Sequence, residues 1–141
     1  MVQIKILNYG SLNIDLIFTV DHIVLPGETI SSSSLIKSAG GKGANQSAAL
    51  GKAGTNVFHA GKVGEDGRFL IDLLCEYGVD TRFITVGENP SGQALIQLDK
   101  HSQNSIILFP GENKAITIEE IDEVLQFFSS GDFLVLQHEI V

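Results

Sequence analysis

The chain alternates short apolar segments of strand length with segments of helical periodicity, and this alternation constrains its fold more than any other feature. The apolar segments include Ile4–Tyr9, Val57–Val63 and Phe133–Gln137. Helices are predicted between them over 43–54 and 66–78. Strands that alternate with helices form a mainly parallel sheet, because each helix returns the chain to the start of the next strand. The sequence therefore predicts an α/β fold.

Capping residues and apolar spacing mark the predicted helices. Asp66 is the expected N-cap of the helix over 66–78, whose apolar stripe at i, i+3, i+4 and i+7 consists of Leu70, Leu73, Leu74 and Tyr77. Cys75 lies beside that stripe and is expected to be a partly buried residue rather than a nucleophile. Thr117 and Glu120 have the spacing of a capping box, which predicts a further helix up to Gly131.

Several extended segments do not fit the alternation. They are the polar segment Glu28–Ser38 and the two segments Gln93–Asp99 and Ser105–Phe109, which have the pattern of a β-hairpin. We place these segments in a separate small sheet. The length of 141 residues fits one domain and leaves no room for two well-filled cores.

Charge and composition exclude several classes of function. The chain carries 9 Lys and Arg against 17 Asp and Glu, a formal charge of −8, and it lacks the basic clusters that nucleic acids require. No apolar run approaches the length of a membrane span, and no signal peptide is evident. The histidines are too scattered to favour a zinc site. A single cysteine fits a reducing compartment, so we expect a cytoplasmic protein without nucleic-acid or membrane partners.

The glycine cluster over 40–43 opens the first predicted helix. It is not a Walker A loop, because Lys42 is followed by Gly43 rather than by Ser or Thr, and it has no G-x-G-x-x-G spacing. Glycines let backbone amides approach a ligand closely, and the helix N-terminus favours polar oxygens. Asn45, in the first turn, can point back at the same ligand. The alternative is a turn made only for packing.

Three further polar residues are candidates for ligand binding. Asn13 and Asp15 are two residues apart in an extended segment, so their side chains share one face. A carboxylate that accepts and an amide that donates and accepts suit a polyol. Glu139 follows the last strand, at the end where open α/β sheets bind ligands. The alternatives are a solvated polar face for the pair and an exposed residue for Glu139.

Taken together, these motifs resemble the N-terminal part of the ribokinase-like carbohydrate kinases, the PfkB family. The order and spacing match along essentially the whole chain. The segments that carry the resemblance are Gly10-Ser11-Leu12-Asn13-Ile14-Asp15, Pro26-Gly27-Glu28-Thr29, Gly40-Gly41-Lys42-Gly43-Ala44-Asn45-Gln46, Gly61-Lys62-Val63-Gly64-Glu65-Asp66-Gly67, Gly78-Val79-Asp80 and Gln137-His138-Glu139. The form of the segment over 40–46 is close to that of the ribokinases.

The resemblance implies an incomplete ribokinase-like fold of a single domain, with a small β lid from strands near 13–38 and 92–110. It implies that the lid covers a small-molecule sugar and pairs with the lid of a second subunit in a homodimer. The residues that it assigns to sugar binding are Asn13, Asp15, Gly41, Lys42, Gly43, Asn45 and Glu139. Ala94 and Ile96 are expected to contact the sugar from the hairpin.

Members of this family are considerably longer than 141 residues. The resemblance implies an ATP-dependent kinase that phosphorylates D-ribose with Mg²⁺, and a monovalent-cation site is possible. Its catalytic Asp, most of its ATP site and its cation site would lie outside this chain. We therefore expect the 141 residues alone to be inactive, and the Phe133–Gln137 strand to need a cover from a longer chain or a partner. The alternative function is a non-catalytic sugar-binding or assembly module.

Overall fold

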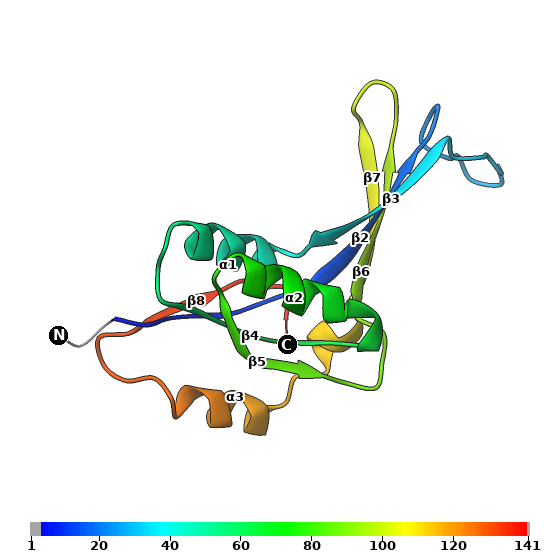
Figure 1. Cartoon of the computed structure of the whole chain (residues 1–141). Helices are drawn as coiled ribbons and strands as arrows, with labels where there is room; N and C mark the ends of the chain where they lie inside the picture. Colours follow the sequence, from blue (N-terminus) through cyan, green and yellow to red (C-terminus); the bar gives the residue numbers. More distant parts are fainter. Residues whose placement is uncertain (1–3, 141) are drawn as a thin grey trace.

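The computed structural model describes residues 4–140, and two four-stranded sheets form its framework (Figure 1). The first sheet contains the part of the chain in which strands alternate with helices. The second sheet projects away from the first, with its hairpins at the far end (Figure 1). The predicted α/β fold with a separate small sheet is therefore confirmed. Within residues 4–140, no helix has both the length and the apolar character that a membrane crossing requires.

The first sheet is parallel throughout. Its strands, in spatial order, are β5 (Asp80–Val86), β4 (Val57–Val63), β1 (Ile6–Tyr9) and β8 (Phe133–Leu136). Because β1 lies in the centre, the residues that follow it leave the sheet between β4 and β8, at the carboxyl ends of all three strands. Ligands of open α/β sheets bind at this edge.

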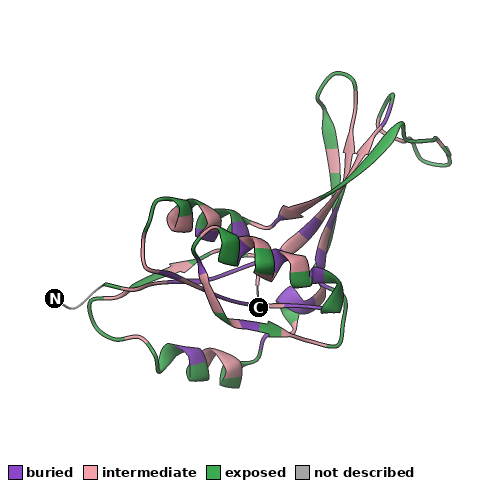
Figure 2. Ribbon diagram, viewed as in Figure 1, coloured by how far each residue is buried: buried purple, intermediate pink, exposed green. Residues whose placement is uncertain are grey.

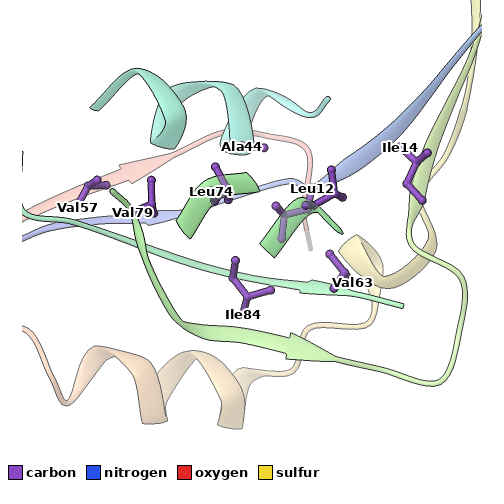
Figure 3. Close-up of a cluster of buried hydrophobic side chains, with 9 residues drawn as sticks. Leu12, Ile14, Ala44, Val57, Val63, Leu74, Val79 and Ile84 are labelled. Atoms are coloured by element: carbon purple, nitrogen blue, oxygen red, sulfur yellow. The ribbon is translucent and has the colours of Figure 1, made fainter. Parts of the chain in front are cut away.

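Helices cover both faces of the first sheet. They are α1 (Lys42–Lys52), α2 (Arg68–Glu76) and α3 (Ile118–Leu125), with short 3-10 turns η1 (Glu65–Gly67) and η2 (Gly111–Lys114). The larger core, drawn in Figure 3, joins α1 and α2 to one face through residues that include Leu12, Val63 and Leu74. A smaller cluster of buried residues around Leu7 and Val124 packs α3 against the other face of the same sheet.

The second sheet has mixed pairing. Its strands, in spatial order, are β3 (Ser34–Gly40), β2 (Asn13–Thr19), β6 (Gly92–Leu98) and β7 (Asn104–Phe109). The central strands β2 and β6 are parallel, and each outer strand is antiparallel to its neighbour. The end nearest the first sheet is the more buried one, whereas the far end is largely exposed (Figure 2). The second sheet is therefore packed against the rest of the molecule mainly at the end nearest the first sheet.

Most predicted element boundaries agree with the structure, and five predictions need correction. The helix expected up to Gly131 ends at Leu125. The strand expected over Glu28–Ser38 begins only at Ser34. Asp66 is not the N-cap of α2, because Gly67 has that position and Asp66 instead accepts hydrogen bonds from Ser91. Cys75 is exposed, because it lies one residue beyond the buried stripe of α2. Strand β5 was not predicted, although its run of β-branched and aromatic residues favours a strand. The capping box of Thr117 and Glu120 is confirmed.

Strand β8 forms an exposed edge of the first sheet, as expected. Phe133, Leu134 and Leu136 are 61%, 52% and 61% exposed. Beside them, a cavity of about 460 Å³ lies between β8 and α3, lined by residues that include Tyr9, Leu125 and Leu136. Such an apolar strand edge is a ready template for further chain or for another molecule.

A buried chain of polar side chains ties α1 to β1 and β4. Asn8 Nδ2 donates to Ser47 Oγ at 2.8 Å, and Ser47 Oγ lies 2.7 Å from His59 Nδ1. His59 Nε2 lies 3.2 Å from the carbonyl oxygen of Gly10, which can only accept, so Nε2 carries the proton and Nδ1 accepts from Ser47. All three side chains are fully buried. This network holds the imidazole neutral.

Burial of His59 makes the stability of the fold dependent on pH. Desolvation lowers the pKa of His59 to about 4, although the hydrogen bond to Gly10 opposes it. Since the unfolded imidazole binds a proton near pH 6.5 and the folded one does not, the stabilising contribution is complete above pH 6.5 and is lost as the pH falls toward 4. The difference corresponds to about 3 kcal/mol.

We expect His59→Gln to remove this part of the pH dependence. In denaturant titrations between pH 7 and pH 4, the free energy of unfolding of the wild type should fall by about 3 kcal/mol more than that of the variant. His101→Gln, at an exposed position, is the matched control and should keep the wild-type slope. Equal slopes for wild type and His59→Gln would contradict this assignment.

Candidate functional site

The candidate site lies where the two sheets meet. The chain leaves β1 at Tyr9, passes through Gly10 to Leu12 and enters the second sheet at Asn13. Within this passage Ser11 and Leu12 are fully buried. The N-terminus of α1 packs against the same passage, because Ala44 N donates to the carbonyl of Ser11 at 2.9 Å. A connection, a strand and a helix start are thus held together at one point.

The glycine turn makes this packing possible. A Cβ at Gly43 would lie 2.4 Å from Ser11 N, and a Cβ at Gly10 would lie 2.7 Å from Gly43 Cα. Gly41 has a φ of +94°, a conformation that L side chains rarely adopt. Any other residue at these positions would push α1 away from the chain that enters the second sheet. Packing alone explains the glycines, and the same packing leaves the turn in contact with the candidate polar residues.

Asn13 and Asp15 lie on one face of β2, as predicted. The carboxylate of Asp15 lies directly over Gly40, where a Cβ would be 2.1 Å from Oδ1. Ala94 is the register partner of Asp15 on β6, so its small side chain lies on the same face. Burial raises the pKa of Asp15, and the nearby carboxylate of Glu139 raises it further. The structure therefore brings Asp15, Glu139 and the glycine turn together.

Glu139 binds the start of α1. Its Oε2 accepts from Ser11 Oγ at 2.6 Å and from Lys42 N at 3.2 Å, and its Oε1 lies 2.8 Å from Lys42 Nζ. Ser11 Oγ in turn accepts from Gly43 N at 3.2 Å. Burial favours the neutral form of Glu139, but the hydrogen bonds from Lys42 and Ser11 outweigh it and hold its pKa below the usual value. The carboxylate therefore stays charged next to the helix N-terminus.

The structure does not bring every candidate to the same place. Asn45 lies in the first turn of α1, but its exposed side chain lines a separate cavity between α1 and α2, together with Ser38 and Leu74. Within residues 4–140 its side chain makes no hydrogen bond to the other candidates, although its backbone N donates to Gly41 O at 3.0 Å. Ile96 lies two residues beyond Ala94 on the same face of β6, farther from the junction.

These groups are suited to a small polyhydroxylated molecule. The carboxylates of Asp15 and Glu139 accept hydrogen bonds, the amide of Asn13 and the ammonium of Lys42 donate them, and a hydroxyl group can do both. Among residues 4–140, no cluster of three or more His, Cys, Asp or Glu side chains is arranged to hold a metal ion.

Comparison with known proteins identifies the family. Over residues 3–141 the chain matches the family described as pfkB family carbohydrate kinase. The chain belongs to this family. It is 37% identical over 134 residues to ribokinase from Bacillus subtilis, which covers 93% of this chain and 45% of that protein. It is 34% identical over 134 residues to deoxyribokinase from Salmonella typhi, covering 93% of this chain and 44% of the relative.

A solved structure supports the same relationship. The structure of Arabidopsis thaliana ribokinase complexed with ribose and ATP matches with a TM-score of 0.77 at 29% identity, and covers 100% of this chain and 47% of that one. This chain of the pfkB family thus spans less than half the length of the relatives that it matches.

Two residues of the candidate site had no role in the sequence prediction. Ser11 belongs to the Gly10–Asp15 motif, but only the structure shows that its hydroxyl group hydrogen-bonds both Glu139 and Gly43. Asn113 follows a Pro-Gly turn and is 2% exposed, and it donates to Asn13 across 100 residues of sequence. No local sequence pattern can predict a contact between residues so far apart in the chain.

Proposed function

We propose that this chain is the sugar-binding part of an ATP-dependent carbohydrate kinase that phosphorylates D-ribose. The observation that carries the proposal is the meeting of Asn13, Asp15 and the glycine turn at the junction of the two sheets. Glu139 completes the arrangement through its contacts with Ser11 and Lys42.

In this proposal each candidate has a role that its environment supports. Asp15 accepts hydrogen bonds from sugar hydroxyls, because its carboxylate has no hydrogen-bond partner within residues 4–140. Gly41 and Gly43 bring the main chain close to the sugar, and Lys42 and Glu139 lie on one side of it. Asn45 would need to turn its exposed side chain toward this side of α1. Ala94 gives the sugar an apolar contact from β6.

The nucleotide and its metal are proposed on the family relationship. ATP as the phosphoryl donor is supported by the nucleotide in the Arabidopsis thaliana ribokinase. We propose that Mg²⁺ accompanies the nucleotide, since divalent metal neutralises phosphate charge in phosphoryl transfer. We assign no residue of this chain to ATP, to Mg²⁺ or to a monovalent cation.

Ribose is the proposed substrate because of the relatives and the form of the glycine turn. The Bacillus subtilis relative is a ribokinase, and the Arabidopsis thaliana structure holds ribose. The Salmonella typhi deoxyribokinase is almost as similar. Ribose and deoxyribose are both five-carbon sugars, so the relatives together favour a substrate of this size.

We also propose that a second copy of the chain packs on the sugar-facing side of the second sheet. A row of four isoleucines, Ile36, Ile17, Ile96 and Ile106, crosses the sheet on the face that carries Asp15. The two outer members, Ile36 and Ile106, are 54% and 50% exposed. An apolar face of this kind beside polar candidate residues favours a covering subunit, and a homodimer through the lid would also screen the sugar from water.

The substitution Asp15→Ala tests sugar binding. We expect it to weaken the binding of D-ribose by the 141-residue chain by about 1–3 kcal/mol, because it removes a charged acceptor of hydroxyl groups. Isothermal titration calorimetry measures the change. Asp122→Asn, at an exposed position of α3, is the control and should leave the affinity unchanged. Wild-type affinity in Asp15→Ala would contradict the role of this carboxylate.

Phosphoryl transfer is expected to be absent from these 141 residues on their own. Our proposal assigns no side chain of residues 4–140 to the phosphate that is transferred. Catalysis of phosphoryl transfer depends mostly on positioning and on charge stabilisation around that phosphate. A coupled assay for ADP measures the activity, with and without D-ribose. Ribose-dependent ADP formation by the pure chain would contradict the expectation that these residues lack catalytic activity on their own.

Two neighbouring substitutions in β7 test the proposed dimer. Ile106→Asp places a charge on the sugar-facing side, whereas Ile107→Asp places the same charge on the opposite side, because successive residues of a strand point to opposite faces. We expect only Ile106→Asp to convert the dimer to a monomer in sedimentation velocity. A monomeric wild type, or dissociation caused only by Ile107→Asp, would rule out this interface.

A further inference from the structure

Asn113 is a buried side chain whose hydrogen bonds connect the main chain to the candidate sugar site. It lies in η2, between β7 and α3, and is 2% exposed. Its Oδ1 accepts from Leu12 N at 3.0 Å, and its Nδ2 donates to Leu12 O at 3.1 Å and to Asn13 Oδ1 at 2.7 Å. All of its amide atoms therefore have partners.

The main chain fixes the orientation of both amides. Leu12 N–H can only donate and Leu12 O can only accept, so the oxygen of Asn113 must face the former and its NH₂ group the latter. The same NH₂ group faces Asn13, so the atom of Asn13 that receives it must be the oxygen. A flip of either amide would place two donors or two acceptors opposite each other.

This polarity leaves the NH₂ group of Asn13 as the part of its amide that has no partner within residues 4–140. Its Oδ1 is occupied by Asn113, and its Nδ2 makes no hydrogen bond within residues 4–140. On the same face of β2, two residues on, the carboxylate of Asp15 can only accept while it is ionised. A pair of one donor and one acceptor matches adjacent hydroxyl groups, since one can accept from the amide while another donates to the carboxylate.

The fold makes room for this contact. Gly92 is the register partner of Asn13 on β6, and a Cβ there would lie 2.1 Å from Asn113 Nδ2 and 2.3 Å from Asn13 Oδ1. The turn that carries Asn113 is fixed as well, because Glu112 N donates to Pro90 O at 3.0 Å. The loop that precedes β6 therefore holds the turn of Asn113 in place.

We infer that Asn113 is a positioning residue that sets Asn13 as a hydrogen-bond donor toward the sugar. This inference rests on the proposed function, because it assigns the ligand of Asn13 to a sugar hydroxyl. Asn113 does not touch the sugar itself. It acts through the amide of Asn13 and so determines which hydroxyl pattern the site accepts.

Asn113→Asp is the variant that tests the inference. The substitution keeps the shape but replaces the NH₂ donor with an acceptor that faces both Leu12 O and Asn13 Oδ1, so the amide of Asn13 is expected to flip and present its oxygen beside Asp15. We expect D-ribose affinity, measured by calorimetry, to fall about tenfold or more. Asn104→Asp, the same change at an exposed position of β7, is the control and should stay within about twofold of the wild type.

A double-mutant cycle separates positioning from a general structural effect. If Asn113 acts through Asn13, Asn113→Asp should have almost no further effect on ribose affinity in an Asn13→Ala background. An equal loss in both backgrounds would overturn the inference, because it would mean that Asn113 affects the site by another route.

Side-chain amide exchange tests the orientation without any sugar. In ¹⁵N-labelled wild type, the Nδ2 protons of Asn113 should exchange slowly with water and those of Asn13 rapidly. The reverse pattern would overturn the inference. If the exchange pattern holds but the wild type binds no sugar in calorimetry, the amide polarity stands, and both the proposed function and the assignment of a sugar to Asn13 are overturned.

Discussion

The close approach of two backbone segments, Gly10–Ser11 and Gly41–Gly43, is the constraint on which the rest of the structure depends. A Cβ at Gly43 would come within 2.4 Å of Ser11 N, so the approach exists only because side chains are absent. It aligns the N-terminus of α1 with the exit of β1 and directs the chain into the second sheet. Ser11 and Glu139 then satisfy the backbone amides that the approach brings together.

The buried hydrogen-bond network around His59 also stabilises this junction. Asn8 donates to Gly43 O as well as to Ser47, so the polar chain that begins at His59 ends at the glycine turn. Gln137, at the end of β8, donates to Asn8 Oδ1 at 2.8 Å and extends the network toward Glu139. Buried polar groups are costly unless they are satisfied, which makes such a network specific for one arrangement of α1, β1, β4 and β8.

The sequence predicts what local chemistry determines. The alternation of apolar and helical segments predicts the parallel sheet, and the spacing of Asn13 and Asp15 places them on one face. It does not predict contacts set by the tertiary fold. Asp66 has the chemistry of an N-cap, yet Ser91 competes for its carboxylate and Gly67 takes that position. Asn113 shows no periodic or capping signal, because its partners lie about a hundred residues away. The side chain of Asn45 depends on a rotamer that no spacing defines.

Because glycines occupy much of the junction, few side chains are available there to contact a ligand. Gly10, Gly40, Gly43 and Gly92 leave space that is filled by backbone or by polar groups of distant residues. Asn13 is oriented from η2, Asp15 lies between Gly40 of β3 and Ala94 of β6, and Glu139 reaches back to α1. The site therefore forms only when both sheets and α1 are docked. A ligand that contacted all of these groups would bind only the docked arrangement and would therefore stabilise the junction.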